Sequence, residues 1–468
     1  MPYKNFLAGF TAPLIVLVLA ASLIMTATRA AAQTETVIYN FANIQGDTTG
    51  GTEPSSRLRF DAAGNLFGLA SGGGIYGPGT MFELTPASDG GWTERAAYSF
   101  KGPPQGKHPS AGLSADSAGN LYGVTLAGGG GTSICGLWGA GCGTVFKLMP
   151  QAGGNWSAKY LHLFQGNDDG AYPYGGVIID AAGNVYGTTY VGGKGPCAEY
   201  SGGPAVGCGT VFELSPTATG GWVKKVLHNF QGAILGAPGL DGQAPFGSLI
   251  LDAAGNLYGT TTTGGAYGKG TVFELLPKSG GGWAERILHN FNFNGSDGYA
   301  PQAGLVFDTA GNLYGTTQLG GAGQCMDYSG TQVIGCGAVF ELSPRSGGGW
   351  SEAVAYSFQI NGTDGWYPMG DLVFDASRNL YGTTNEGGSG FCTDWNGVLL
   401  GCGTVFKLSR NPGESWTETV LHDFQNIPSD GQFPTGDVIL DASGNLYGTT
   451  YSGGNSGSGG GTVFKITP

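Results

Sequence analysis

Three charged residues, Arg57, Asp371 and Asp437, interrupt a repeated pattern at one position of this sequence. Most copies of the repeat have Gly or Ser there, just before a short apolar run. Carboxylates can act as general acids or bases, and an Arg beside them can pair with their charge. Because Arg57 and Asp437 belong to the first and last copies, we expect them to be neighbours, and an ion pair is the plain explanation.

Extra aromatic residues form a second group of candidates, because they lie in long Gly-rich loops. An exposed ring can stack on a sugar, so these loops could form a glycan platform; the alternative is that the rings pack within the loops. The aromatic residues are Trp138, Trp366, Tyr367, Phe391 and Trp395. The candidate ligand-binding residues are Arg57, Trp138, Trp366, Tyr367, Asp371, Trp395 and Asp437. No residue is assigned a catalytic role, and no metal site or cofactor is assigned.

The eight cysteines lie two by two in four of the long loops. An even count in a secreted chain indicates disulfides, and pairing within each loop is favoured because the partners are close in sequence. Zinc is the rival interpretation, but the spacing is wide and none of these loops contains a His. Each bridge is worth ~3 kcal/mol in the chain-entropy model. The expected pairs are Cys135–Cys142, Cys197–Cys208, Cys325–Cys336 and Cys392–Cys402.

Two further groups recur with the repeat. A ring of acidic residues could bind cations, but Asp favours turns and Pro sets the start of the next strand, so turn capping is favoured. A His at one repeated position indicates packing or a bond to the neighbouring copy, whereas catalysis needs one uniquely placed His. The acidic residues begin five Asp-Gly-x-x-Pro phrases, at Asp169, Asp241, Asp297, Asp364 and Asp430. The histidines are His162, His228, His289 and His422.

The repeat is marked by the phrase Asp-x-x-Gly-Asn-Leu-Tyr-Gly-Thr-Thr. Each copy contains four short segments rich in β-branched and aromatic residues, bounded by Gly and Asp turns, which predicts four strands. Four antiparallel strands per repeat form the blade of a β-propeller. The phrase lacks the alternating oxygen ligands and distal Glu of a calcium loop, so we interpret it as a turn. It begins at Asp61, Asp116, Asp180, Asp252, Asp308, Asp375 and Asp441.

The order of the segments predicts an all-β, seven-bladed propeller closed by its N-terminal strand. The fourth-strand segment at 37–41 precedes every other segment, while the last copy ends on its third strand at 463–465. We therefore expect residues 37–41 to complete the last blade. Such a clasp removes the exposed strand edges that invite aggregation.

Loop lengths give the propeller two different faces. The turns between strands one and two, and between strands three and four, have constant length in every copy. The other two connections vary: the interval from Tyr258 to Phe273 is short and that from Tyr314 to Phe340 is long. The variable face also carries all the cysteines, and variable loops on a rigid scaffold are where function usually lies.

Composition and charge exclude several classes of protein. Glycine is abundant, with 92 residues, but 12% aromatic residues argue against disorder. The formal net charge is −13 with only 20 Lys and Arg, so we expect no nucleic-acid partner.

The N-terminal segment resembles a secretory signal peptide. Lys4 supplies a positive charge, an apolar run follows at 12–25, and Ala30-Ala31-Ala32 offers small residues for cleavage. A retained anchor is the alternative, although the run is shorter than the ~20 residues of a spanning helix. We expect a signal peptide at 1–32, with cleavage between Ala30 and Gln33, and one propeller domain at 33–468. The mature chain would then have no transmembrane segment and be a secreted monomer, extracellular or periplasmic, with surface association left open.

The repeated phrase, followed by Gly-Gly and then Gly-Thr-Val-Phe-Glu-Leu, resembles the GloVer tandem repeat of bacterial "choice-of-anchor" surface proteins. The resemblance covers the chain from about Thr36 to Pro468. The repeat also looks, more loosely, like the propeller repeats of two-component sensor ectodomains. The GloVer resemblance implies a secreted or surface protein but no particular activity. The chain departs from that family at its end, where it stops on a third strand with no sorting anchor.

These observations favour a non-enzymatic binding scaffold that recognises an unknown glycan or protein ligand on its variable face. One alternative is a propeller hydrolase or lyase that uses the carboxylates of Asp371 and Asp437 at the channel mouth. Another is a purely structural protein of the cell surface. Fold does not decide among them.

Overall fold

The computed structural model describes most of the chain, all of it within the unit Gln33–Pro468. The described residues are 34–41, 50–131, 135, 141–198, 206–232, 241–327, 329–393, 397–413, 415–455 and 460–467.

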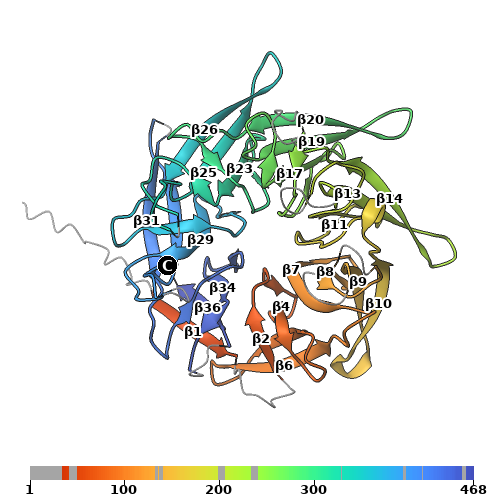
Figure 1. The fold of residues 1–468 in the computed structure, drawn as a ribbon. Coiled ribbons are helices and arrows are strands. Elements are labelled where there is room, and N and C mark those ends of the chain that lie inside the picture. The colour runs from red at the N-terminus through yellow and green to blue at the C-terminus, as the bar shows by residue number, and fades with distance from the viewer. Residues whose placement is uncertain are drawn as a thin grey trace, which may run out of the picture. The chain divides into compact units, whose positions relative to one another are not determined.

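Seven antiparallel sheets, each containing the four strands of one blade, are arranged as a propeller (Figure 1), which confirms the predicted fold. We name the strands of each blade A to D from the channel outward.

In blades 1 to 4 the strands, from A to D, have the following bounds. Blade 1 has β3 (Arg59–Phe60), β4 (Leu66–Gly73), β5 (Thr80–Pro86) and β6 (Trp92–Ser99). Blade 2 has β7 (Lys107–Ala115), β8 (Leu121–Ala127), β9 (Thr144–Pro150) and β10 (Trp156–Leu163). Blade 3 has β11 (Ile178–Ile179), β12 (Val185–Thr189), β13 (Thr210–Pro216) and β14 (Trp222–Asn229). Blade 4 has β16 (Ile250–Leu251), β17 (Leu257–Thr261), β19 (Thr271–Pro277) and β20 (Trp283–Asn290).

Blades 5 to 7 follow the same plan. Blade 5 has β22 (Val306–Phe307), β23 (Leu313–Thr317), β25 (Ala338–Pro344) and β26 (Trp350–Ser357). Blade 6 has β28 (Val373–Phe374), β29 (Leu380–Gly387), β30 (Thr404–Arg410) and β31 (Trp416–Asp423). Blade 7 has β33 (Ile439–Leu440), β34 (Leu446–Thr450), β36 (Thr462–Thr467) and β1 (Thr34–Asn40).

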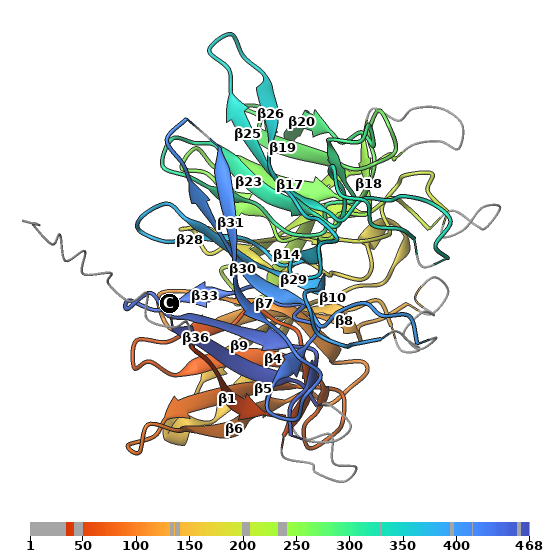
Figure 2. The same cartoon turned by 90° about the vertical axis from the view of Figure 1, so that its left-hand side faces the viewer.

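Short paired strands, which we call rim strands, extend the blades toward the variable face. Seen from the side, rim strand β18 lies on the right while β28 and β33 lie on the left (Figure 2). Two rim strands, β2 (Gly51–Pro54) and β27 (Gly365–Pro368), pair with β4 and β29. The other rim pairs are β15 (Gly242–Gln243) with β18 (Thr263–Gly264), β21 (Gly298–Tyr299) with β24 (Leu319–Gly320), and β32 (Gly431–Gln432) with β35 (Ser452–Gly453). The short 3-10 helices are η1 (Ala152–Gly154) and η2 (Asn167–Asp169).

The N-terminal strand closes the ring, as predicted. Strand β1 pairs antiparallel with the C-terminal strand β36, with Val37 opposite Phe464. In Figure 1 the red β1 lies beside the blue β36. The two ends of the chain therefore share one blade, and every blade acquires a fourth strand.

Aromatic pairs join each blade to the next. The Phe that directly follows strand D of one blade meets the strand C Phe of the following blade edge to face, with ring centroids 4.9–5.3 Å apart. The strand C ring lies over the Gly of Leu-Tyr-Gly-Thr-Thr: a Cβ on Gly315 would be 2.6 Å from Phe340 Cζ. Glycine is thus needed there to make room. The pairs are Phe41–Phe82, Phe100–Phe146, Phe164–Phe212, Phe230–Phe273, Phe291–Phe340, Phe358–Phe406 and Phe424–Phe464.

The Asp-x-x-Gly-Asn phrase forms the A–B turn. Asp180 Oδ1 accepts the N–H groups of Ala182 (2.9 Å) and Asn184 (2.8 Å). Its Oδ2 accepts the Asn184 amide (2.8 Å) and the Tyr186 hydroxyl (3.1 Å). Because the turn itself uses both oxygens, the geometry agrees with the turn interpretation.

Four disulfides lie within the B–C loops and confirm the predicted pairing. The bridges are Cys135–Cys142, Cys197–Cys208, Cys325–Cys336 and Cys392–Cys402. In the described part of the chain, no helix has the length and apolar character to cross a membrane.

Candidate ligand-binding site at the channel mouth

Every blade has a Pro near the end of the D–A connection, where the chain reaches the mouth of the central channel. The next residue differs among the blades, although the positions around it repeat. We call these seven residues the rim ring. They are Ser55, Ser110, Tyr174, Phe246, Gln302, Met369 and Thr435.

The turn that carries the rim ring is held in an unusual conformation. In blade 6 the residue before the Pro, Tyr367, has φ of 55°, a left-handed value rare for non-glycine residues. Its N–H donates to the carbonyl of Cys336 in the preceding blade (3.0 Å). The other residues in this place, also with positive φ, are Glu53, His108, Tyr172, Ala244, Ala300 and Phe433.

The disulfides and the strand C glycines support these turns. The second cysteine of each bridge supplies the carbonyl that accepts the turn N–H in the next blade, as Cys402 does for Phe433 (2.9 Å). The glycine after it leaves room for the Pro: a Cβ on Gly337 would lie 2.6 Å from Pro368 Cδ. The bridges of the variable face therefore act on the geometry of the channel mouth.

A second ring lies two residues after the rim ring in each blade, and we call it the constriction ring. Three members of this ring accept a hydrogen bond from a backbone N–H of the preceding blade. Ser248 accepts from Gly176 (2.9 Å), and Asp371 accepts from Gly304 (2.5 Å). Asp437 accepts from Asp371 (2.6 Å). The carboxylates therefore join neighbouring blades, as the Ser does. The ring consists of Arg57, Gly112, Gly176, Ser248, Gly304, Asp371 and Asp437.

The charged members of the constriction ring influence one another. Burial raises the pKa of Asp371 to about 7; the negative charge of Asp437 adds to this effect and Arg57 opposes it. Burial also raises the pKa of Asp437, again opposed by Arg57. The side chain of Arg57 packs beside Gly112, where a Cβ would lie 2.9 Å from Arg57 Cβ.

The expected ion pair between Arg57 and Asp437 does not form within the described part of the chain. Asp437 Oδ1 is bound to the N–H of Asp371, so Arg57 acts on the carboxylates through the field in the channel. A second cation in the channel, Arg59, was missed by the sequence analysis. It is the only charged residue among the equivalent strand A positions, which otherwise hold Ser, Ile or Val, and that contrast is the signal that could have identified it.

Cavities lie on both sides of the constriction ring. The cavity on the side of the rim ring, which we call the upper cavity, has a volume of about 230 Å³. The cavity on the other side, the lower cavity, has a volume of about 550 Å³ and is lined by strand A from all seven blades. Arg57, Asp371 and Asp437 line both cavities. A ligand in the upper cavity would therefore have one cation and two carboxylic groups beneath it.

Three aromatic side chains mark one side of the mouth. Tyr174 and Phe246 of the rim ring are stacked, with centroids 4.5 Å apart and planes at 18°. Tyr190 meets Tyr174 edge to face at 5.3 Å. Tyr190 also lines a further cavity of about 290 Å³, together with Gln243 and Thr263. All three rings are half-buried; Tyr174 and Phe246 line the upper cavity and Tyr190 lines the further one, and we call this trio the aromatic ridge.

The aromatic residues chosen from the sequence do not gather at this mouth. Tyr367 is 3% exposed and, together with Trp366, lines a separate cavity of about 340 Å³. Trp366 is half-buried and donates Nε1–H to the carbonyl of Leu400 (2.9 Å), while Phe391 is exposed. Trp138 and Trp395 lie outside the described residues. Tyr174, Tyr190 and Phe246 were missed because their positions differ from copy to copy of the repeat, so an aromatic residue there breaks no pattern.

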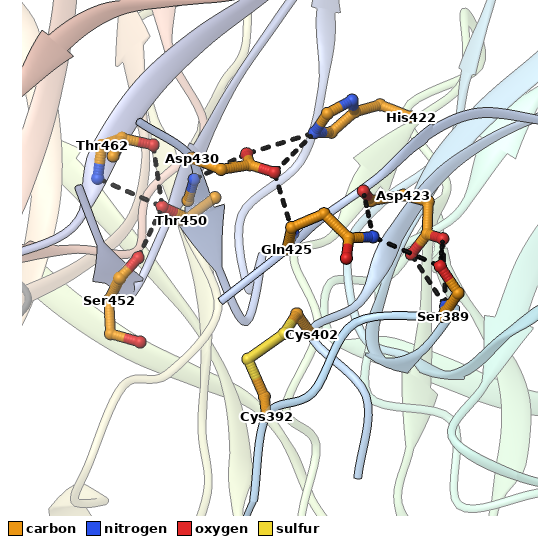
Figure 3. Close-up of polar contacts among 11 residues, drawn as sticks. Ser389, Cys392, Cys402, His422, Asp423, Gln425, Asp430, Thr450, Ser452 and Thr462 are labelled. Atoms are coloured by element: carbon orange, nitrogen blue, oxygen red, sulfur yellow. Dashed lines mark hydrogen bonds and ion pairs between the residues drawn. A yellow bond between two sulfur atoms is a disulfide. The ribbon is translucent and has the colours of Figure 1, made fainter. Parts of the chain in front are cut away.

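The repeated His and Asp residues lie on the outer side of the blades. His422 points toward Asp430, with Nε2 3.1 Å from Oδ1, and Asp430 Oδ2 accepts the N–H of Gln425 (2.8 Å) (Figure 3). Asp169, Asp241 and Asp297 make the same two contacts in their own repeats. The predicted turn-capping role agrees with this geometry.

A family model described as the Gloeobacter/Verrucomicrobia repeat matches the chain at residues 22–198, 139–392 and 326–468. No curated protein matches the chain.

Several solved structures match the chain at low similarity. A Trichoderma reesei carbohydrate-active enzyme of family AA12 is 14% identical, with a TM-score of 0.40, over 94% of this chain and 96% of that one. A putative oxidoreductase (glucose dehydrogenase) from Thermus thermophilus is 14% identical, with a TM-score of 0.38, over 93% and 100%. A Xanthomonas campestris gluconolactonase is 15% identical, with a TM-score of 0.35, over 76% and 87%. Similarity this low says nothing about activity.

Proposed function

The chain belongs to the Gloeobacter/Verrucomicrobia repeat family, and we propose that it is a non-enzymatic, extracytoplasmic protein that binds the end of a glycan at the channel mouth. The repeat accounts for the scaffold, so the residues that depart from it are the ones free to recognise a ligand. Four disulfides support an oxidising compartment, where such bridges persist.

The aromatic ridge above a charged cavity floor carries this proposal. Tyr174 and Phe246 present half-buried rings at the rim, and Asp371 and Asp437 lie on the floor. Binding sites commonly combine apolar walls with a few polar groups that fix orientation. A sugar has the matching chemistry, since its C–H face suits an aromatic ring and its hydroxyls suit carboxylates and amides.

The second cavity suggests a ligand longer than one sugar. It lies on the far side of Tyr190, and Gln243 and Thr263 supply polar groups there. A linear glycan could place its end in the upper cavity and its next units across the ridge. A protein ligand would use the loops of the variable face more broadly.

The test is a glycan array followed by calorimetry with the best binder. We expect Tyr174→Ala and Phe246→Ala each to weaken binding about tenfold or more, equivalent to about 1.4 kcal/mol or more. Tyr267→Ala is the matched control, because Tyr267 is an exposed aromatic outside the cavity lining. Unfolding temperatures of the variants show whether the fold is intact. An array without binders would favour the structural role, and equal loss in Tyr267→Ala would contradict the rim as the site.

A hydrolase or lyase is the second candidate, because a carboxyl group with a pKa near neutrality suits a general acid. Burial and then Asp437 raise the pKa of Asp371 to about 7. Against this, both carboxylates already accept backbone N–H groups between blades, as Ser248 does. Incubation of the bound glycan with the protein distinguishes the two: the binding proposal expects the glycan to be recovered unchanged. Turnover that Asp371→Asn abolishes would establish the enzyme instead.

A further inference from the structure

An aspartate lies between the outer strands of neighbouring blades at five of the seven blade boundaries. It comes from the D–A loop and faces two residues of strand D, where the Trp that begins the strand is position 1. One is position 7 in its own repeat and the other is position 3 in the next blade; on β1, which has no Trp, the equivalent residue is Glu35. The sets, in chain order of the Asp, are His162–Asp169–Lys224, His228–Asp241–Glu285, His289–Asp297–Glu352, Tyr356–Asp364–Glu418 and His422–Asp430–Glu35.

Three of these sets offer one imidazole nitrogen and two carboxylate oxygens. In each set the three ligand atoms lie within 4.8 Å of one another. At the boundary between blades 3 and 4, His228 Nε2 is 3.2 Å from Asp241 Oδ2 and 3.7 Å from Glu285 Oε1. Ligands at ~2.1 Å from one zinc ion lie about 3.0–3.4 Å apart for angles between octahedral and tetrahedral, so the set is close to this geometry.

These sets contain buried carboxylate oxygens that make no hydrogen bond within the described residues. Asp297 is 6% exposed, and its Oδ1 is buried with no hydrogen-bond partner among the described residues. The Oε1 atoms of Glu35, Glu285 and Glu352 are likewise buried without a donor. A buried carboxylate oxygen without a partner is costly, so a positive species at this place would stabilise the fold.

The boundary between blades 2 and 3 has its own cation at the equivalent place. There Lys224 stands where the other sets have Glu, and its Nζ lies 2.8 Å from Asp169 Oδ1. His162 keeps the usual contact with that Asp, at 3.0 Å. The ammonium group therefore marks the point where a cation would lie in the three sets that combine His, Asp and Glu.

We propose that His228–Asp241–Glu285, His289–Asp297–Glu352 and His422–Asp430–Glu35 each bind a divalent cation of the zinc class. Imidazole nitrogen with carboxylate oxygens suits zinc and related transition metals. Three protein ligands leave a coordination position for water, and the His side chains are 18–20% exposed, so ions can enter from solvent.

Each ion would link two blades, since His and Asp come from one blade and Glu from the next. The third site matters most for closure, because Glu35 lies on the N-terminal strand β1. Its partner His422 lies on β31, and Figure 3 shows that residue directed at Asp430. Metal binding there would hold the closing strand against the neighbouring blade. This inference is independent of the proposed glycan function.

The test uses the full mature protein, stripped with a chelator and titrated with Zn²⁺. We expect three equivalents by calorimetry and by metal analysis after gel filtration, with a rise in unfolding temperature. Glu35→Lys, Glu285→Lys and Glu352→Lys copy the natural Lys224 arrangement, so each should fold and lose one equivalent.

Glu418→Gln is the matched control, because its set has Tyr356 in place of His, and it should retain three equivalents. Substitution of Co²⁺ for Zn²⁺ should give visible d–d absorption that falls by about one third in each Lys variant. Absence of stoichiometric binding would overturn the proposal, since it would show that protons alone neutralise these sets. Three retained equivalents in the Lys variants would also overturn it, because the ions would then lie elsewhere.

Discussion

Single residues at varied repeat positions give this propeller its chemical character. The constriction ring is Gly or Ser in four blades, while Arg57, Asp371 and Asp437 supply charge in the other three. The same holds at the blade boundaries, where Lys224 or Tyr356 replaces one member of an otherwise repeated set. Because the backbone is nearly the same in each blade, such replacements change the chemistry of one sector and leave the scaffold intact.

Glu418 should make stability depend on pH. Burial raises its pKa to about 7, and the negative charge of Asp364 adds to this effect. As pH rises above 4.5 the unfolded chain loses this proton first, so the free energy of unfolding should fall between pH 4.5 and about 7. Glu418→Gln should flatten that slope and stabilise the protein at pH 7.5 by about 1 kcal/mol.

Urea unfolding at several pH values measures this effect. At pH 4 the variant and the parent should have similar stability, since the carboxyl is largely protonated in both states, which provides an internal control. A slope unchanged by Glu418→Gln would show that another group governs the pH dependence.

At the scale of elements, the D–A turn and the B–C loop form one unit across each blade boundary. The cysteine carbonyl, the left-handed residue before Pro and the strand C glycine fit together, as Cys336, Tyr367 and Gly337 do. At four boundaries the carbonyl belongs to a bridged cysteine, and at the other three it belongs to Pro78, Lys269 or Gly460.

Gly337→Ala tests this unit. The residue has φ of 95°, and a Cβ would lie 2.6 Å from both Pro368 Cδ and the carbonyl of Thr317. We expect a loss of about 3 kcal/mol, from left-handed strain together with overpacking. Gly348→Ala is the control, since it has φ of 86° and open space around the new Cβ, and it should cost about 1 kcal/mol. Denaturant unfolding measures both, and equal losses would contradict the packing argument.

At the scale of the whole molecule, stability depends on ring closure. Strand β1 provides blade 7 with its outer strand, and Phe41 packs edge to face on Phe82 of blade 1. Seven blades in a closed ring give each blade two neighbours, whereas an open ring would expose two apolar blade faces.

Deletion of residues 34–41 should therefore yield an aggregating or unfolded protein, as seen by gel filtration and circular dichroism. A circular permutant that moves residues 33–41 behind Pro468, joined by a Gly-rich turn of the kind at 345–349, should restore the monomeric fold. Its unfolding temperature should lie within a few degrees of the parent's. A deletion variant that remains a stable monomer would show that closure by β1 is dispensable.

The repeat in the sequence was enough to predict seven blades, the closing strand and the four disulfides. These features depend on local patterns, because turns, strand alternation and cysteines close in sequence need no knowledge of distant contacts. Asp371 and Asp437 were also identifiable, since they break a pattern that can be read along the chain.

Only the tertiary structure decided which of the positions that depart from the repeat lie close together. The rim residues Tyr174 and Phe246 are 72 positions apart in sequence yet stacked, and Glu35 reaches the neighbourhood of His422 only because the ring closes. The sequence also gave no sign that Asp437 would accept a backbone N–H and leave Arg57 unpaired with it. Partners across a blade boundary depend on side-chain direction and on closure of the whole ring, which no local pattern encodes.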